Sequence, residues 1–354
     1  MQSIVLSNHS LPTLCQLCHA MGILKNALEP GAIAAIFTLG AWINRRHDRR
    51  GDNDPIRAPL LLNHDIDQER DTHGDPGEDT VTGASGRKRL SLQSRALARF
   101  PFFLEIWYWL LIYWIYQGAR AISARVIANN EAIFSTAENH AIQLLSFENR
   151  LNIDIELPVQ RFILSKAPRL MEILAVIYYS HIVLGVAFYV YSYTYLPRHR
   201  YQAIRRALAL MNVIAFIILS FWRCAPPRLL PSDFGFVDIL HQGDSGSAWT
   251  RNKFQLTIAA MPSLHFGNSV FIAFCLVVFS QHVFLRIVAM LWPILMGWTV
   301  IATANHFVLD MVVGVVVVLV AYLLNRVMLI PLPVERVLFR LMRLEKPRQR
   351  SGDK

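Results

Sequence analysis

The stretch LWPILMGWTVIATANHFVLDMVVGVVVVLVAYLL, residues 291–324, contains two long apolar runs that are separated by one short polar break. A helix needs roughly 17–25 mostly apolar residues to cross a bilayer, and the runs Val283–Ala304 and Phe307–Ile330 are long enough. We therefore expect two membrane-spanning helices that are joined by a turn at Asn305–His306. This pattern predicts an all-α fold in a polytopic integral membrane protein.

The composition of the whole chain supports this interpretation. The 354 residues are 54% hydrophobic and only 17% charged, and the mean hydropathy is +0.34. Such a chain is too apolar for an ordinary soluble globule. Four further apolar runs and one weaker run lie at Pro101–Gln117, Leu170–Leu196, Ala207–Trp222, Phe266–Ser280 and near Ile33–Ile43. We expect six to seven transmembrane helices with a helical-bundle core.

The charged residues are concentrated in a few segments that organise the chain. The net charge is +10, and the basic clusters lie in residues 44–99, in residues 198–206 and near the C-terminus. The positive-inside rule places all three on the cytoplasmic side, and this arrangement disfavours nucleic-acid binding. The charged 44–99 segment is predicted to be disordered. The expected parts are an N-terminal segment with a possible transmembrane helix (1–43), a disordered cytoplasmic loop (44–99), a membrane-embedded domain (100–330) and a basic cytoplasmic tail (331–354).

The same topology places residues 223–265 and the turn at Asn305–His306 on the opposite, lumenal or external face. A glycosylation sequon at Asn8–Ser10 would lie on that face if the seventh span exists. Residues 118–169 carry apolar side chains at helical spacing. This pattern fits an amphipathic helix on the membrane surface or a packed lumenal cap.

The first polar cluster at the outer membrane edge is FWRCAPPRLLP, residues 221–231. Arg228 lies between prolines, which stiffen the backbone on both sides of it. A rigidly presented guanidinium is suited to gripping a phosphate with two parallel hydrogen bonds. The alternative is an arginine that extends to the lipid headgroups.

The second cluster is the segment AAMPSLHF, residues 259–266. With Pro262 in the first turn of a helix, the N–H groups of Ser263, Leu264 and His265 would be unbonded and would attract an anion. Ser263 adds a hydroxyl group, and His265 can give or accept a proton. The alternative is a helix cap next to an interfacial histidine.

The third cluster contains His306 and Asp310, whose spacing of four residues places them on one face of a helix. A carboxylate inside an apolar span is costly and indicates a functional site. Asp310 would hold one imidazole nitrogen of His306 and leave the other as a nucleophile or base. The alternative is a structural pair that ties two helices together.

The three clusters share one membrane level, and together they predict a phosphate site with two histidines. No three metal ligands occur at the spacing of a metal site. We therefore expect no metal and no cofactor.

These residues resemble the membrane-embedded type 2 phosphatidic acid phosphatase superfamily. The segment MPSLH (261–265) is followed about forty residues later by NHFVLD (305–310), and APPRLLP (225–231) precedes both. The resemblance covers roughly residues 100–330 and is strongest in their last part. Leu264 stands where lipid phosphate phosphatases usually have glycine, which makes the chain similar to inositol phosphorylceramide synthases and to related fungal and bacterial membrane proteins.

The resemblance implies a role for each matching residue. His306 would attack phosphorus and form a phospho-histidine, and Asp310 would orient and stabilise it. His265 would protonate the leaving oxygen and then deprotonate the acceptor. Arg228 and Ser263 would hold the phosphoryl oxygens, together with nearby backbone N–H groups.

Two positions depart from the phosphatase pattern. That pattern has a lysine where this chain has Phe221, and a second arginine where this chain has Val300. The loss of two cations favours a phosphodiester monoanion over a monoester dianion. Arg223, Arg251 or Lys253 could supply the missing charge. The roles of Glu148 and Glu156 stay open, and both could simply be solvated.

The function expected from these residues is transfer of a phospho-head-group, such as phosphoinositol, to a lipid acceptor such as ceramide. One alternative is a lipid phosphate phosphatase, and another is a catalytically silent lipid-binding or scaffold protein. The expected partners are lipids in the bilayer, with monomer and dimer both compatible. The expected location is the Golgi or the endoplasmic reticulum, with a lumenal site.

Overall fold

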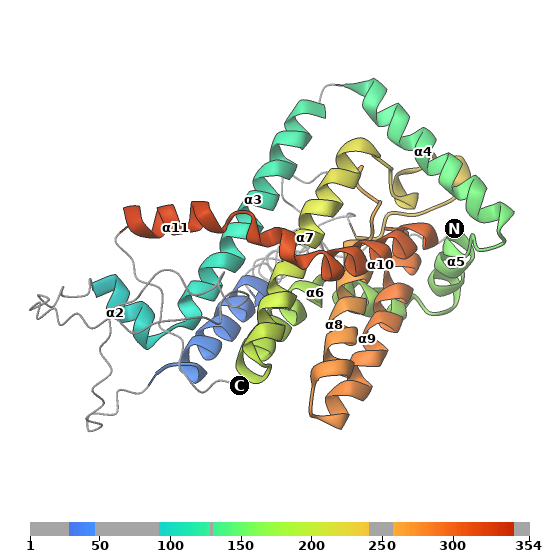
Figure 1. Cartoon of the computed structure of the whole chain (residues 1–354). Coiled ribbons are helices and arrows are strands. Elements are labelled where there is room, and N and C mark those ends of the chain that lie inside the picture. Colours follow the sequence, from blue (N-terminus) through green and yellow to red (C-terminus); the bar gives the residue numbers. More distant parts are fainter. Residues whose placement is uncertain (1–27, 47–91, 128–129, 241–257, 343–354) are drawn as a thin grey trace, which may run out of the picture.

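The computed structural model describes residues 28–46, 92–127, 130–240 and 258–342, and these parts are almost entirely helical (Figure 1). They contain no strand beyond one isolated parallel bridge between Cys224 and Ala259. The all-α prediction is therefore confirmed. After the first helix, Leu28–Ile43, the main helices are α2 (Leu92–Arg99), α3 (Phe102–Ile127), α4 (Glu131–Arg150), α5 (Glu156–Lys166), α6 (Pro168–Tyr195), α7 (Arg198–Phe221), α8 (Leu264–Phe279), α9 (Val283–Ala302), α10 (Val308–Leu323) and α11 (Leu332–Leu341).

All predicted apolar runs correspond to helices in the described residues. The helices α6, α7 and α9 are long and apolar enough to cross a membrane. Two bent helix pairs, α2 with α3 and α10 with the segment Asn325–Leu341, raise the number of candidate spans to five. The helix Leu28–Ile43 and α8 are apolar but shorter. By length and composition, the described residues thus contain three to five candidate spans beside the two shorter apolar helices, within a membrane helical fold.

The largest core lies among α7, α8 and α10, where Ile204, Phe271 and Val317 are buried together. Helices α8 and α9 pack side by side as an antiparallel pair (Figure 1). α8 crosses α10 at two glycines, because a Cβ atom on Gly314 would lie 2.5 Å from the carbonyl oxygen of Ser263. A Cβ atom on Gly267 would lie 2.9 Å from the carbonyl oxygen of Gly314. This close crossing brings the N-terminal ends of α8 and α10 together.

The two ends of the bundle carry different residues. At one end, Arg206 Nε donates to Asn325 Oδ1 at 3.0 Å, and the N–H of Arg46 donates to the carbonyl of Arg99 at 2.8 Å. Arg206 of the 198–206 segment thus contacts the residues that lead into the predicted tail, and the two ends of the 44–99 segment lie together. The cytoplasmic assignment of the basic segments stays a prediction. At the other end, the N–H of Arg228 donates to the carbonyl of Ala304 at 3.0 Å.

Several predicted boundaries differ from the structure. Residues 92–99 form helix α2, so the end of the predicted disordered loop is helical. Helix α3 continues ten residues beyond Gln117. Residues 131–166 form two helices, and Ala137 and Ala141 of α4 are fully buried, as expected for the packed cap. The first part of the predicted tail forms α11. Residues 47–91 and the Asn8–Ser10 sequon lie outside the described residues.

Candidate active site

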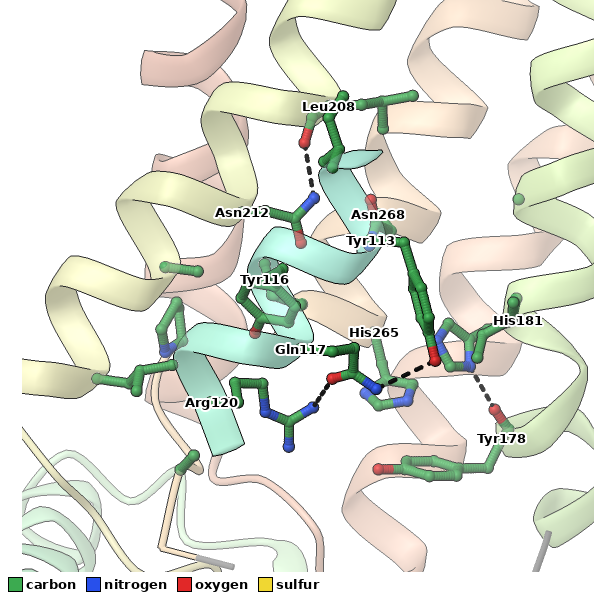
Figure 2. A pocket seen from close by; sticks show the side chains of 18 of the residues that line it. Tyr113, Tyr116, Gln117, Arg120, Tyr178, His181, Leu208, Asn212, His265 and Asn268 are labelled. Atoms are coloured by element: carbon green, nitrogen blue, oxygen red, sulfur yellow. Dashed lines mark hydrogen bonds between the residues drawn. The ribbon is translucent and has the colours of Figure 1, made fainter. Parts of the chain in front are cut away.

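A cavity of about 400 Å³ lies inside the helix bundle, between α3, α6, α7 and α8. Its lining includes three of the predicted site residues, Arg228, His265 and His306. Figure 2 shows the polar side chains of α3, α6 and α8 around this space. The sequence clusters, which are distant along the chain, therefore contribute to one cavity.

His306 lies in the loop before α10 and not on the helix, which corrects the prediction that it shares a helical face with Asp310. Its Nδ1 atom lies 2.7 Å from the carbonyl oxygen of Ala260 and 3.6 Å from Asp310 Oδ2. Because a carbonyl oxygen can only accept, Nδ1 carries the hydrogen in this contact. In neutral His306 the lone pair is then on Nε2, which leaves that atom available as a nucleophile.

Asp310 occupies the third position of α10 and is fully buried. Its Oδ2 atom accepts a hydrogen bond from the N–H of Phe307 at 2.9 Å. Oδ1 is buried and has no hydrogen-bond partner among the described residues. Asp310 therefore fixes the start of α10 and also places a carboxylate next to the imidazole of His306.

Ser263 is the N-cap of α8, and Pro262 precedes the cap. The N–H of Ser263 donates to the carbonyl oxygen of Asp310 at 3.0 Å, so it is not the unbonded donor that the sequence suggested. The hydroxyl oxygen of Ser263 accepts from the N–H of Phe266 at 3.5 Å, and the fully buried side chain is not part of the cavity lining. Ser263 thus caps α8 and links it to α10.

His265 is the second residue of α8, where the backbone N–H groups have no acceptor within the helix. Its ring lies between two neighbours on α6, with centroid distances of 4.1 Å to Tyr178 and 4.0 Å to His181. The centroids of the His265 and His306 rings are 6.0 Å apart. Packing by α6 therefore orients His265 toward the same space that His306 lines.

Arg228 lies in a short 3₁₀ turn, Pro227–Leu229, and its side chain is 8% exposed. Its Nη1 atom donates to Asn305 Oδ1, and its Nε atom lies 3.4 Å from Asp238 Oδ2. Burial lowers the pKa of Arg228 from its ordinary value, and Asp238 counteracts this shift. The guanidinium keeps its charge, and its position beside the residue that precedes His306 is fixed.

Arg120 on α3 is a lining residue that the sequence did not reveal. Its Nη1 atom lies 3.5 Å from Gln117 Oε1, and its Nε atom is buried without a hydrogen-bond partner among the described residues. In Figure 2 its side chain lies beside Gln117, near the imidazole of His265. Arg120 lies more than one hundred residues before the other clusters. No motif in the sequence links it to them.

The two departures from the phosphatase pattern lie away from the cavity. Phe221 is 87% exposed, and Val300 is fully buried in the core. Arg223 does not belong to the cavity lining, and Arg251 and Lys253 lie outside the described residues. Among the described residues, Arg120 therefore adds a cation to the cavity beside Arg228.

The charged side chains that line the cavity in the described residues are all positive. Its lining includes the guanidinium groups of Arg120, Arg205 and Arg228, and none of the described lining residues is Asp or Glu. Arg205 is paired with Glu105 at 2.6 Å. Arg120 and Arg228 remain to attract an anion, although Arg228 also lies 3.4 Å from Asp238. The imidazoles of His181, His265 and His306 line the same space. The described residues contain no group of three or more His, Cys, Asp or Glu side chains that could hold a metal ion, and the expectation of a metal-free site stays a prediction.

Comparisons with known proteins identify the family. A family model described as the PAP2 superfamily matches residues 142–324, which is just over half of the chain. No curated protein and no solved structure gives a significant match. The matched region runs from α4 to the end of α10 and contains Arg228, His265 and His306. The chain therefore belongs to the PAP2 superfamily, a membrane helical family of lipid phosphatases and phosphotransferases.

Proposed function

We propose that this protein is a lipid phosphotransferase, which moves a phospho-head-group such as phosphoinositol to a lipid acceptor such as ceramide. The observation that carries the proposal is the shared cavity of His265 and His306, which Arg228 and Arg120 make electropositive. A phosphodiester is an anion, and two partly buried guanidinium groups in one cavity are suited to it. The contact between His306 Nδ1 and Ala260 supports His306 as the nucleophile.

In the first step, Nε2 of His306 attacks the phosphorus atom of the donor lipid. The bond from phosphorus to the glycerol oxygen breaks, and that oxygen takes a proton from His265. Arg228 and Arg120 stabilise the charge that develops on the phosphoryl oxygens. Asp310, 3.6 Å from Nδ1 of His306, stabilises the positive charge of the phospho-imidazole.

In the second step, His265 takes the proton from the hydroxyl group of the acceptor. The acceptor oxygen attacks phosphorus, the P–N bond breaks, and neutral His306 is regenerated. A covalent intermediate divides one difficult displacement into two easier ones. The transferase and a phosphatase share this chemistry, and the exclusion of water from the second step separates them.

A lipid phosphate phosphatase is the second candidate, and Arg120 is the observation that favours it. The loss of two cations from the family pattern argued against a doubly charged monoester. Arg120 restores one of these charges inside the cavity, so a monoester dianion becomes a more suitable substrate than the sequence suggested.

A single assay separates these functions. Purified protein is given labelled phosphatidylinositol, ceramide and phosphatidic acid, and the products are resolved. The proposal predicts a labelled inositol phosphoceramide product and little free phosphate. Release of inorganic phosphate from phosphatidic acid without head-group transfer would establish the phosphatase, and a protein inert toward all three lipids would support the silent scaffold.

A further inference from the structure

Two glutamates lie directly behind the loop that holds His306. Glu148 is near the end of α4, Glu156 is the first residue of α5, and both are fully buried. Glu156 Oε1 accepts a hydrogen bond from the N–H of Val308 at 2.8 Å. Glu148 Oε1 accepts one from the N–H of Leu309 at 2.7 Å. Both side chains therefore bind the first turn of α10, and neither is solvated.

Three consecutive backbone amides at this point each donate to a different carboxyl group. The N–H of Phe307 donates to Asp310, and the next two donate to Glu156 and Glu148. The first N–H groups of a helix have no acceptor within it, and the positive end of the helix favours negative charge there. The loop with His306 is thus held by α4, α5 and α10 at once.

The remaining oxygens of the two glutamates reveal a second property. Oε2 of Glu148 and Oε2 of Glu156 are buried and have no donor among the described residues. The two carboxyl groups are neighbours, because they accept from the adjacent N–H groups of Val308 and Leu309, and each affects the pKa of the other. A hydrogen bond between them requires a proton on one of them, because a carboxylate can only accept. A single shared proton gives both oxygens a partner.

The electrostatics of this region agree with a shared proton. Burial is the main cause that raises the pKa of Glu148 to about 9, and the neighbouring carboxyl of Glu156 adds to it. Burial also raises the pKa of Glu156. Among the described residues, the titratable groups that act on the pair include Asp154, Asp310 and the Cys224 thiol, and none of these three brings a positive charge.

We propose that Glu148 and Glu156 share one proton and are positioning residues, which hold the start of α10 so that His306 and Asp310 keep their geometry. They act through the backbone of residues 308–309 and do not contact the substrate. This proposal extends the proposed function, and its activity measurement requires that function to be correct. Its pH measurement is independent of that function.

Amide substitutions distinguish a shared proton from simple packing. In Glu148→Gln the amide oxygen can accept from Leu309, and the amide NH₂ can donate to Glu156. In Glu156→Gln the amide oxygen can accept from Val308, and the amide NH₂ can donate to Glu148. The double variant places two NH₂ groups against each other without an acceptor. Each single variant should therefore replace the proton, whereas the double variant should displace the loop.

The pH dependence follows from the sign of the pKa shift. A carboxyl group with a raised pKa in the folded state stabilises that state most below the ordinary glutamate pKa, and this contribution falls as the pH rises toward about 9. The Tm of the unaltered protein should therefore decrease with pH over this range. The profile should be flatter in either single glutamine variant, because its hydrogen bond does not titrate.

The experiment compares the unaltered full chain with Glu148→Gln, Glu156→Gln, the double variant and Glu131→Gln, a matched exposed position on α4. In detergent, Tm is measured against pH, and kcat and KM are measured with a fluorescent phosphatidylinositol at neutral pH. We expect flattened Tm profiles and kcat within about threefold for the single variants. We expect a kcat decrease of about 100-fold with little change in KM for the double variant, as for a small displacement of a reacting group.

Single variants that lose as much kcat as the double variant would overturn the proposal. So would Tm profiles that coincide with that of the unaltered protein, or a Glu131→Gln profile that flattens equally. An unaltered protein without lipid turnover would refute the proposed reaction. The Tm profiles would still decide whether the carboxyl pair shares a proton.

Discussion

The imidazole of His306 is held chiefly by the backbone of Ala260, because its Nδ1 atom lies 2.7 Å from that carbonyl oxygen. The carboxylate of Asp310 is farther away, at 3.6 Å from the same atom. Ala260 belongs to the segment just before α8, so the proposed nucleophile, His306, is oriented by the segment that leads to the proposed general acid, His265. Asp310 contributes negative charge and fixes the start of α10. Its loss should therefore reduce activity less than the loss of His306 does.

Asp310→Asn should reduce kcat by about 10- to 100-fold, a typical effect for a residue that supports a reacting group. The asparagine oxygen can still accept from the N–H of Phe307, and Ala260 still orients the ring. Steady-state kinetics measure kcat for Asp310→Asn and for His306→Ala under the same conditions. Equal losses in the two variants would contradict the assignment of ring orientation to Ala260.

Arg120→Gln should raise KM and reduce kcat, because the phosphoryl group loses one of two guanidinium contacts inside the cavity. The effect should be about 1.5–3 kcal/mol in kcat/KM, as for a hydrogen bond to a charged group. Arg125→Gln is the matched control, since this arginine is exposed on the same helix. Unchanged kinetics in Arg120→Gln would remove Arg120 from the phosphate site.

The site shows what the sequence could and could not predict. His306 and Asp310 were identified because polar residues are rare and costly in apolar spans, and Arg228 because of its flanking prolines. Arg120 looked like any arginine near the end of an apolar run. Ala260 acts through a backbone carbonyl, which every residue carries, so no side-chain pattern marks it.

Gly314→Ala should reduce activity by about 100-fold, because the added Cβ would lie 2.5 Å from the carbonyl oxygen of Ser263. The helices must separate at this crossing, and displacements of about 1 Å near a reacting group have effects of this size. Gly118→Ala on α3 is the control, since a Cβ atom there meets nothing within 4 Å. Full activity in Gly314→Ala would show that the crossing does not set the site geometry.

Glu105→Ala should destabilise the fold by about 3–5 kcal/mol, the usual result of removing one partner of a buried ion pair. Glu105 Oε2 accepts from Arg205 at 2.6 Å and from the Tyr201 hydroxyl at 2.7 Å. Thermal unfolding in detergent measures the loss. The double variant Glu105→Ala/Arg205→Ala should recover part of the stability, and strictly additive losses would show that the pair is not coupled.

The helical class and the apolar runs were predictable because hydropathy acts locally along the chain. The boundaries were less predictable, since α3 continues ten residues beyond its apolar run and residues 92–99 form α2. The burial of Glu148 and Glu156 could not be predicted, because their partners are backbone N–H groups about 150 residues away. A carboxylate in a polar stretch is ordinarily solvated, and only tertiary packing distinguishes these two.

The central claim is a phosphoinositol group bound covalently to His306, and a rapid acid-free quench with phosphorus-labelled phosphatidylinositol tests it most directly. Mass spectrometry of the quenched protein should locate an acid-labile phosphoinositol group on the peptide that contains His306. The group should accumulate when no acceptor is present and disappear in His306→Ala. Full turnover in His306→Ala, or a labelled peptide from another part of the chain, would contradict the mechanism.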